Sequence, residues 1–375
     1  GVSGTAKVLG GELYGALTGV YTGQRQEDPR GNNSNDSVNM EKAFVGWRYD
    51  QGIPTGIPSL DIDSIDLSVG RQEYRIGSGF LIWDGTFRRR DNVGFQFDPR
   101  QVWQLAGVGR VGVGPLTIEG FYLNPEAEND YRRMTVEAKG WGINAEYDLD
   151  TTGILGGTLG ATFGHVFDGD GLPIREGGNI YNVRANITPL PSSLPGLSFY
   201  GEVAYEENGS RAQALGYALQ AGYKVTEWWG KPSLSYRYAY FSGDDPDTEN
   251  KNEAFDPLAY GGSDWGTWFQ GEIIGHYVLL NTNLKTHLVR FDLRPLDDVM
   301  AGIQLYKFEL DHAQAVGATA SSFAHELDVT ATWFIDKRFR ITAVGGVARP
   351  AQAAKQLTGG TKDWLIGKLF LNFDL

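Results

Sequence analysis

The sequence contains no cysteine and only 3 methionines among its 375 residues. Without cysteine there is no disulfide framework, so the redox state of the compartment is left open. The chain also lacks a long apolar run. No stretch approaches the ~18 consecutive apolar residues that a membrane-spanning helix needs, and the mean hydropathy is −0.31. The class of the protein therefore depends on how the dispersed apolar residues are spaced.

Positive charge is also in short supply, because the formal net charge is −13. This balance argues against a general nucleic-acid binder, since phosphate backbones are neutralised by Lys and Arg. It suits a surface protein with acidic, solvated loops. No signal peptide is present, and the numbering starts at Gly1, so we expect a mature chain from which the signal peptide has been removed.

Residues 284–347 show the clearest pattern in the chain, an alternation of apolar and polar side chains. Leu327, Val329 and Ala331, for example, alternate with Asp328 and Thr330. A period of two residues is typical of a β-strand with one apolar and one polar face. We interpret this region as four consecutive antiparallel strands, and the alternation continues along almost the whole chain.

The same alternation fits two architectures. In a soluble sandwich the apolar face is the core, whereas in a membrane barrel it faces lipid and the polar face lines a lumen. Aromatic residues beside turns, such as Trp228, Trp229 and Trp333, favour the membrane because barrels carry aromatic girdles. No blade-length repeat supports a propeller. We predict an all-β, transmembrane antiparallel β-barrel in the bacterial outer membrane, with a large soluble β-sandwich or propeller as the alternative.

The connections between the predicted strands differ in length in a regular way. We count about 16 strands, with 14–18 possible, in one barrel domain covering residues 1–375. Long connections fall on one side, at residues 24–38, 70–100, 168–178, 242–282, 311–321 and 349–361. Tight ones fall on the other, at residues 50–59, 111–115, 148–153, 189–196, 228–232, 295–298 and 336–337. Short periplasmic turns with longer extracellular loops are typical of outer-membrane barrels.

Two of these connections are long inserts, at residues 70–100 and 242–282. The first is basic, and we expect its arginines to form a positive constriction, since rings of Arg or Lys select anions. These are Arg71, Arg75, Arg88, Arg89, Arg90 and Arg100. The alternative is an exposed loop whose arginines contact lipopolysaccharide phosphates. The second insert is predicted to be a lid at the pore mouth, or else a surface lid without solute contact.

Several short motifs resemble those of the alginate-export-type outer-membrane porins. They are Gly70-Arg71-Gln72, Tyr74-Arg75-Ile76-Gly77, Phe97-Asp98 with Arg100, Phe255-Asp256-Pro257-Leu258, Asn283-Leu284 and Arg294-Pro295. The resemblance implies a monomeric barrel whose long loops fold over or into the pore, and which passes a hydrophilic solute down its gradient. Alginate exporters of this family use an arginine-rich pore, and the matching positions here are Arg71, Arg75 and Arg100. The family is broad, and the resemblance does not imply alginate itself.

The inferred lumen face carries charges of both signs. Its basic residues are Arg48, Arg184, Lys224, Arg237, Arg290, Arg338, Arg340 and Lys368, and its acidic residues are Asp66, Glu119, Glu146, Glu202, Glu206, Asp292, Glu326 and Asp328. Such groups either contact the solute or only pair across strands. Together with the arginines of the first insert, we take Arg184, Arg237 and Arg290 as candidate pore-constriction residues that bind the solute.

These features predict a passive porin for hydrophilic, anionic solutes, such as acidic saccharides or organic acids, with outer-membrane lipid and lipopolysaccharide as its surroundings. A barrel-embedded hydrolase and a surface receptor or adhesin with a closed lumen are the alternatives. The five histidines, which are His165, His276, His287, His312 and His325, show no metal-ligand spacing. His325 and Glu326 should lie on opposite faces of a strand. We therefore predict no catalytic residue, no metal and no cofactor.

Overall fold

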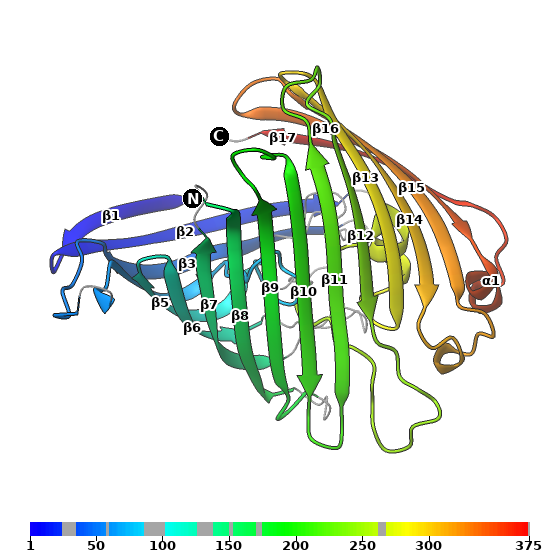
Figure 1. The fold of residues 1–375 in the computed structure, drawn as a ribbon, viewed down its shortest axis with the longest axis horizontal. Coiled ribbons are helices and arrows are strands. Elements are labelled where there is room, and N and C mark those ends of the chain that lie inside the picture. Colours follow the sequence, from blue (N-terminus) through cyan, green and yellow to red (C-terminus); the bar gives the residue numbers. More distant parts are fainter. Residues whose placement is uncertain are drawn as a thin grey trace. The chain divides into compact units, whose positions relative to one another are not determined.

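The computed structural model describes residues 1–24, 35–57, 60–85, 102–125, 138–149, 153–169, 175–261 and 268–373. Over these residues the chain is all-β, with 17 strands in one antiparallel sheet (Figure 1). The fold class predicted from the alternation is therefore confirmed. The strand number lies one above the expected value and within the expected range.

The strands have the following bounds: β1 Val2–Val8, β2 Gly11–Gln24, β3 Asn35–Tyr49, β4 Ser64–Gln72, β5 Trp103–Val113, β6 Leu116–Asn124, β7 Lys139–Leu149, β8 Leu155–Asp168, β9 Asn179–Pro189, β10 Leu197–Glu207, β11 Gln213–Lys224, β12 Ser233–Phe241, β13 Leu284–Leu296, β14 Val299–Leu310, β15 Ser322–Phe334, β16 Phe339–Pro350 and β17 Trp364–Phe373. In the part of the chain that the structure describes, three short helices lie between strands: the π-helix η2 (Gly271–Val278), the 3₁₀-helix η3 (Gln314–Val316) and α1 (Gln352–Thr358). None of the helices in the described ranges is long and apolar enough to cross a membrane.

The additional strand is β1, which precedes the first strand expected from sequence. It pairs antiparallel with the first half of β2, from Val2 opposite Leu17 to Val8 opposite Gly11. All seven of its residues are exposed, and most are small or polar. It therefore lacks the run of alternating apolar residues from which the other strands were recognised.

Short and long connections alternate along the described chain as expected, with one exception. The tight turns include Asp297-Asp298 between β13 and β14, and residues 335–338 between β15 and β16. The long connections include residues 242–283, which contain η2, and residues 351–363, which contain α1. Because consecutive strands are antiparallel, alternate connections lie at opposite ends of the strands. Residues 208–212 between β10 and β11 are a short connection at the end that otherwise carries the long ones.

The chain divides into two compact units. The first contains residues 1–148, 160–181 and 258–261, and the second contains residues 149–159, 182–257 and 262–375. In the first unit, β1 to β7 pair in sequence order. In the second unit, β10 to β17 do the same. The expectation that residues 1–375 form a single domain stays a prediction.

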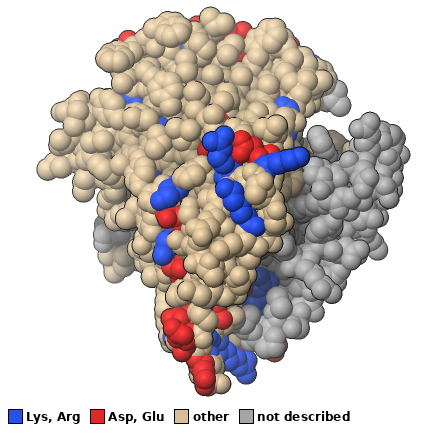
Figure 2. All heavy atoms as spheres, turned by 90° about the vertical axis from the view of Figure 1, so that its right-hand side faces the viewer, with Lys and Arg blue, Asp and Glu red and all other residues tan. Residues whose placement is uncertain are grey.

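Burial in both units is the reverse of that in a water-soluble sheet. On β15 the side chains of Leu327 and Val329 are 37% and 47% exposed, whereas Asp328 between them is 0% exposed. On β4, Leu67 is 51% exposed and Ser68 only 8%. Figure 2 likewise shows a side on which most described atoms belong to uncharged residues, with the charged atoms gathered in the central and lower part of the view. An exposed apolar face opposite a buried polar face is the arrangement of a lipid-facing strand.

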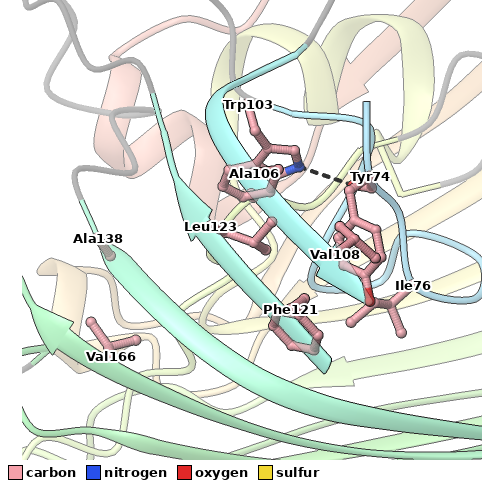
Figure 3. Packing of buried hydrophobic residues seen from close by; sticks show 10 residues of the cluster. Tyr74, Ile76, Trp103, Ala106, Val108, Phe121, Leu123, Ala138 and Val166 are labelled. Carbon is pink, nitrogen blue, oxygen red and sulfur yellow. Dashed lines mark hydrogen bonds between the residues drawn. The ribbon is translucent and has the colours of Figure 1, made fainter. Parts of the chain in front are cut away.

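In the first unit, the described part of the first insert packs on the sheet. Tyr74 and Ile76 lie against Val108 of β5 and Phe121 of β6, in a cluster of buried side chains (Figure 3). The indole Nε1 of Trp103 donates to the backbone oxygen of Tyr74 at 2.9 Å. Phe80 and Trp83 of the same segment are buried as well.

Candidate functional site

The candidate site is the polar face of the second unit, where the strand register aligns charged residues in transverse rows. In one row, Arg237 of β12 is followed on successive strands by Leu288, Tyr306 and Glu326. In the next, Ser235 is followed by Arg290, Gln304 and Asp328. The register thus gathers basic side chains on β12 and β13, and acidic side chains on β15. Sequence alternation predicted the face of each charge, but not that they meet in these rows.

Arg237 is covered by the second insert. Its guanidinium carbon lies 4.6 Å from the ring centroid of Trp268, and both residues are buried. Trp268 is fixed by its backbone oxygen, which accepts a hydrogen bond from Nδ2 of Asn281 at 2.9 Å. A cation over an aromatic face is attracted by the ring quadrupole, more strongly when both are removed from water. Residues 268–283 therefore lie on the polar face instead of extending away from the sheet.

The first turn of η2 is bound by two carboxylates of β15. The backbone N–H of Glu272 donates to Oδ2 of Asp328 at 3.0 Å. The next two N–H groups, of Ile273 and Ile274, donate to the two carboxylate oxygens of Glu326 at 2.7 and 2.9 Å. The first N–H groups of a helix have no partner within the helix, and carboxylates are favoured there. Glu326 and Asp328, predicted as lumen charges, thus act as an anchor for the insert.

A second contact ties η2 to β17. Nζ of Lys368 donates to Oε2 of Glu272 at 2.6 Å, and Nδ1 of His276 lies 3.4 Å from the same oxygen. Burial by itself raises the pKa of Glu272. Hydrogen bonds and charges of His276 and Lys368 outweigh it and hold the pKa below its usual value. The carboxylate thus stays ionised, although Glu272 is only 2% exposed.

The other two arginines predicted on this face have local polar partners. Nη1 of Arg184 on β9 donates to Oδ1 of Asn182 at 3.3 Å, and the residue is buried. Nε of Arg290 donates to Oδ2 of Asp292 at 2.7 Å, and its side chain keeps 28% exposure. Of the three, Arg290 is therefore the most exposed to solvent.

The arginines of the first insert fall in different places. Arg71 pairs with Ala43 on the face of β4 that carries Leu67 and Val69, and its Nε donates to the backbone oxygen of Glu41 at 3.1 Å. Arg71 therefore does not line the polar face. Arg75 lies 4.3 Å from the ring centroid of Trp83.

The acid beside Arg75 is Asp84, since Nε of Arg75 and Oδ1 of Asp84 are 3.6 Å apart. Burial raises the pKa of Asp84, and the charge of Arg75 opposes that rise. Arg88, Arg89, Arg90 and Arg100 lie outside the described residues, so their role in a constriction stays a prediction.

Several charged residues of the first unit pair with an opposite charge on a neighbouring strand. Such pairing was the alternative to contact with the solute. Arg48 contacts Glu12 at 2.9 Å. Arg110, which the sequence did not single out, pairs with Glu119 on the next strand. Glu119 also accepts from Nδ2 of Asn144 at 2.7 Å. The prediction that His325 and Glu326 lie on opposite faces is confirmed, because His325 is exposed and Glu326 is buried.

Comparison with solved structures places the chain in a class. It shares the β-barrel fold of the OccK and OprD outer-membrane porins. OccK2 (OpdF) of Pseudomonas aeruginosa is 12% identical with a TM-score of 0.56, covering 99% of this chain and 88% of that one. OccK9 (OpdG) of the same organism is 12% identical with a TM-score of 0.56, covering 99% and 87%. OccK2 (OpdF) in complex with glucuronate gives 12% identity, a TM-score of 0.55, and 99% and 89% coverage.

The sequence itself identifies the family. The alginate export model matches residues 172–363, which is just over half of the chain. The chain belongs to the alginate export family, as the short motifs predicted. No curated protein matches the chain in sequence.

Proposed function

We propose that the protein is a passive outer-membrane channel for hydrophilic, anionic solutes, either small or oligomeric. The observation that carries the proposal is the reversed burial of alternate residues, combined with arginines on the polar face. An exposed apolar wall suits lipid, and a polar face with fixed charges suits a water-filled lumen. A passive pore needs no catalytic residue or cofactor, and the solute moves down its gradient.

The anionic class of solute is supported by chemistry and by the comparisons. Guanidinium groups bind carboxylates through a planar fork, often with two hydrogen bonds. The family is named for alginate export, and one structure with the same fold contains glucuronate, which is a sugar acid. Acidic saccharides and organic acids are therefore the proposed solutes.

We assign the solute contact first to Arg290, because its side chain keeps solvent exposure beside Asp292. Arg237 and Arg184 lie deeper on the same face and add positive charge behind it. Arg75 and the arginines of the first insert beyond residue 85 form a second candidate constriction. The insert carrying η2 narrows the pore, since its described part lies on the polar face of the second unit.

The proposed location is the outer membrane, with the signal peptide removed and a monomer as the working unit. Membrane lipid and lipopolysaccharide would surround the apolar face, and the solute would be the only other partner. A barrel-embedded hydrolase would instead show activity on lipid or peptide substrates that is lost at one Ser or His. A receptor with a closed lumen would show no conductance.

Reversal potentials in a planar bilayer under a salt gradient test the assignment. Arg290→Gln should lower anion preference, and Arg184→Gln/Arg237→Gln/Arg290→Gln should lower it further. A control removes two exposed cations from turns, as Lys231→Gln/Lys337→Gln, and should change the preference less. Unchanged reversal potentials in Arg290→Gln and in the triple variant would contradict the role of these arginines.

A further inference from the structure

The apolar face of the second unit ends in a row of basic side chains. His287 of β13 is opposite Lys307 of β14, Lys307 is opposite His325 of β15, and His325 is opposite Arg349 of β16. Residues directly opposite each other share a face. The face is the apolar one, because these positions follow the same parity as exposed Leu327 and Val329.

The row lies directly at the edge of the apolar band. Two residues further along each strand, the positions on the same face are Val289, Leu305, Leu327 and Val347, which are also opposite one another. Along β15 the outward side chains then stay apolar through Trp333. The basic row is at the strand ends that carry the long connections, which contain η2, η3 and α1. The change from apolar to basic thus occurs between neighbouring rows of the same face.

Within the row, Lys307 and Arg349 stand on either side of His325. Opposite residues in a sheet have Cβ atoms about 4.5–5.5 Å apart, so the two cations lie close enough to act on one ligand. Part of the charge is balanced, because Glu309 lies 3.0 Å from Lys307 and Asp363 lies 3.1 Å from Arg349. His325, between Lys307 and Arg349, has no hydrogen-bond partner among the described residues. The side chain of Arg349 is still 76% exposed.

We propose that this basic row binds the phosphate groups of an outer-leaflet lipid, namely phosphorylated lipid A. Arg and Lys bind phosphate through charge-assisted hydrogen bonds. The apolar row beside them requires a ligand that continues into acyl chains, which a free phosphate lacks. Lipid phosphates lie at the boundary between hydrocarbon and water, where a basic side chain contributes most. This inference rests on the proposed outer-membrane location and concerns the outer wall, not the pore.

Binding of lipid A to the refolded full chain in detergent tests the proposal, with the same lipid after removal of its phosphates as the second probe. The test variant is Lys307→Gln/His325→Gln/Arg349→Gln. The control variant, Lys231→Gln/Lys337→Gln/Arg338→Gln, removes exposed cations from the turn side. The test variant should bind lipid A roughly 10–30-fold more weakly than the wild type, at about fivefold per lost Lys or Arg. The control variant should bind lipid A with the affinity of the wild type. The dephosphorylated lipid should bind weakly, and with equal affinity, to the wild type and to both variants.

Equal affinity of the wild type for both lipids, or an equal loss in test and control variants, would overturn the proposal. Bilayer conductance of the same preparations separates this inference from the proposed function. The test variant should conduct like the wild type, because the row faces away from the polar face. A wild type that conducts but does not discriminate the two lipids refutes only the lipid A site. A wild type that binds lipid A but does not conduct refutes only the channel.

Discussion

Leu327 and Asp328 are neighbours in β15, yet the leucine is 37% exposed and the aspartate is 0% exposed. The buried carboxylate accepts the backbone N–H of Glu272, while the exposed leucine has Leu305 and Val347 as its cross-strand neighbours. A water-soluble sheet would place these two side chains the other way round. Because apolar side chains such as Leu327 are exposed, their face of the sheet requires contact with lipid. The opposite face is polar and can therefore hold both charged side chains and the second insert.

Val329→Arg tests the lipid-facing role of the apolar face. An arginine at mid-membrane should cost about 2–4 kcal/mol of the free energy of unfolding in lipid vesicles. Ser198→Arg is the matched control, since it places the same side chain on the polar face of β10. The control should stay within about 1 kcal/mol of the wild type. Equal losses in the two variants would contradict a lipid-facing wall.

Glu326→Gln/Asp328→Asn tests the anchor of η2. Charge-assisted hydrogen bonds are roughly twice as strong as neutral ones, and each buried donor left without a partner costs about 1–3 kcal/mol. We expect η2 to detach, so that single-channel conductance rises and residues 268–283 become sensitive to protease. Asp50→Asn/Asp297→Asn removes two carboxyl groups from exposed turns and should leave the conductance near that of the wild type. An unchanged conductance in the first variant would mean that η2 does not narrow the pore.

Asp311 gives a pH dependence for the start of the second insert. Its carboxylate accepts from the backbone N–H of Gly243 at 3.0 Å and lies 2.8 Å from Nζ of Lys285. Burial alone raises the pKa of Asp311, but these bonds and that of Tyr240 outweigh it and lower the pKa below its usual value. Because the pKa of Asp311 is lower in the folded protein than in the unfolded chain, the ionised carboxylate stabilises the fold at pH values above the unfolded-state pKa of about 4. This stabilisation is lost as the pH falls through the folded-state pKa.

We therefore expect hydrogen exchange at Gly243 to stay slow from neutral pH down to about 4, after correction for the intrinsic rate, and to speed up on further acidification. Asp311→Asn should exchange faster already at neutral pH. Asp297→Asn, at the exposed turn between β13 and β14, should behave like the wild type. If acidification below pH ~4 leaves protection intact, the carboxylate is not what holds this loop.

Trp103→Ala tests the packing of the first insert. It removes a buried indole and the hydrogen bond to the backbone oxygen of Tyr74, and Trp-to-Ala changes in a core cost about 3–5 kcal/mol. We expect protease cleavage within residues 73–85 and a smaller loss for Trp103→Phe, which keeps most of the volume. Resistance to cleavage in Trp103→Ala would show that this contact does not fix the insert.

Much of the fold could be predicted because a strand repeats every two residues. Leu327, Asp328 and Val329 already reveal their faces from sequence, and the same rule located nearly every strand. The rule failed for β1, whose residues are mostly small or polar and leave no alternation to detect. The alternation rule also does not predict which residues face each other across strands, since register depends on the turns and on the packing of the whole sheet.

The candidate site was predicted in its chemistry but not in its organisation. Arg237, Arg290 and Glu326 were assigned to the polar face, as observed. The contact of Glu326 with Ile273 joins residues 53 positions apart, and no periodic pattern marks η2 within its insert. Arg71 was chosen from its motif and its charge, and neither shows the face on which a strand residue lies.

Single-channel recording of the refolded wild-type protein in a planar bilayer, with a salt gradient for the reversal potential, tests the central claim most directly. We expect a stable conductance with preference for anions, because arginines on the polar face attract them and repel cations. A protein that inserts but never conducts would contradict the channel. A conductance that prefers cations would contradict the role given to Arg290 and its neighbours.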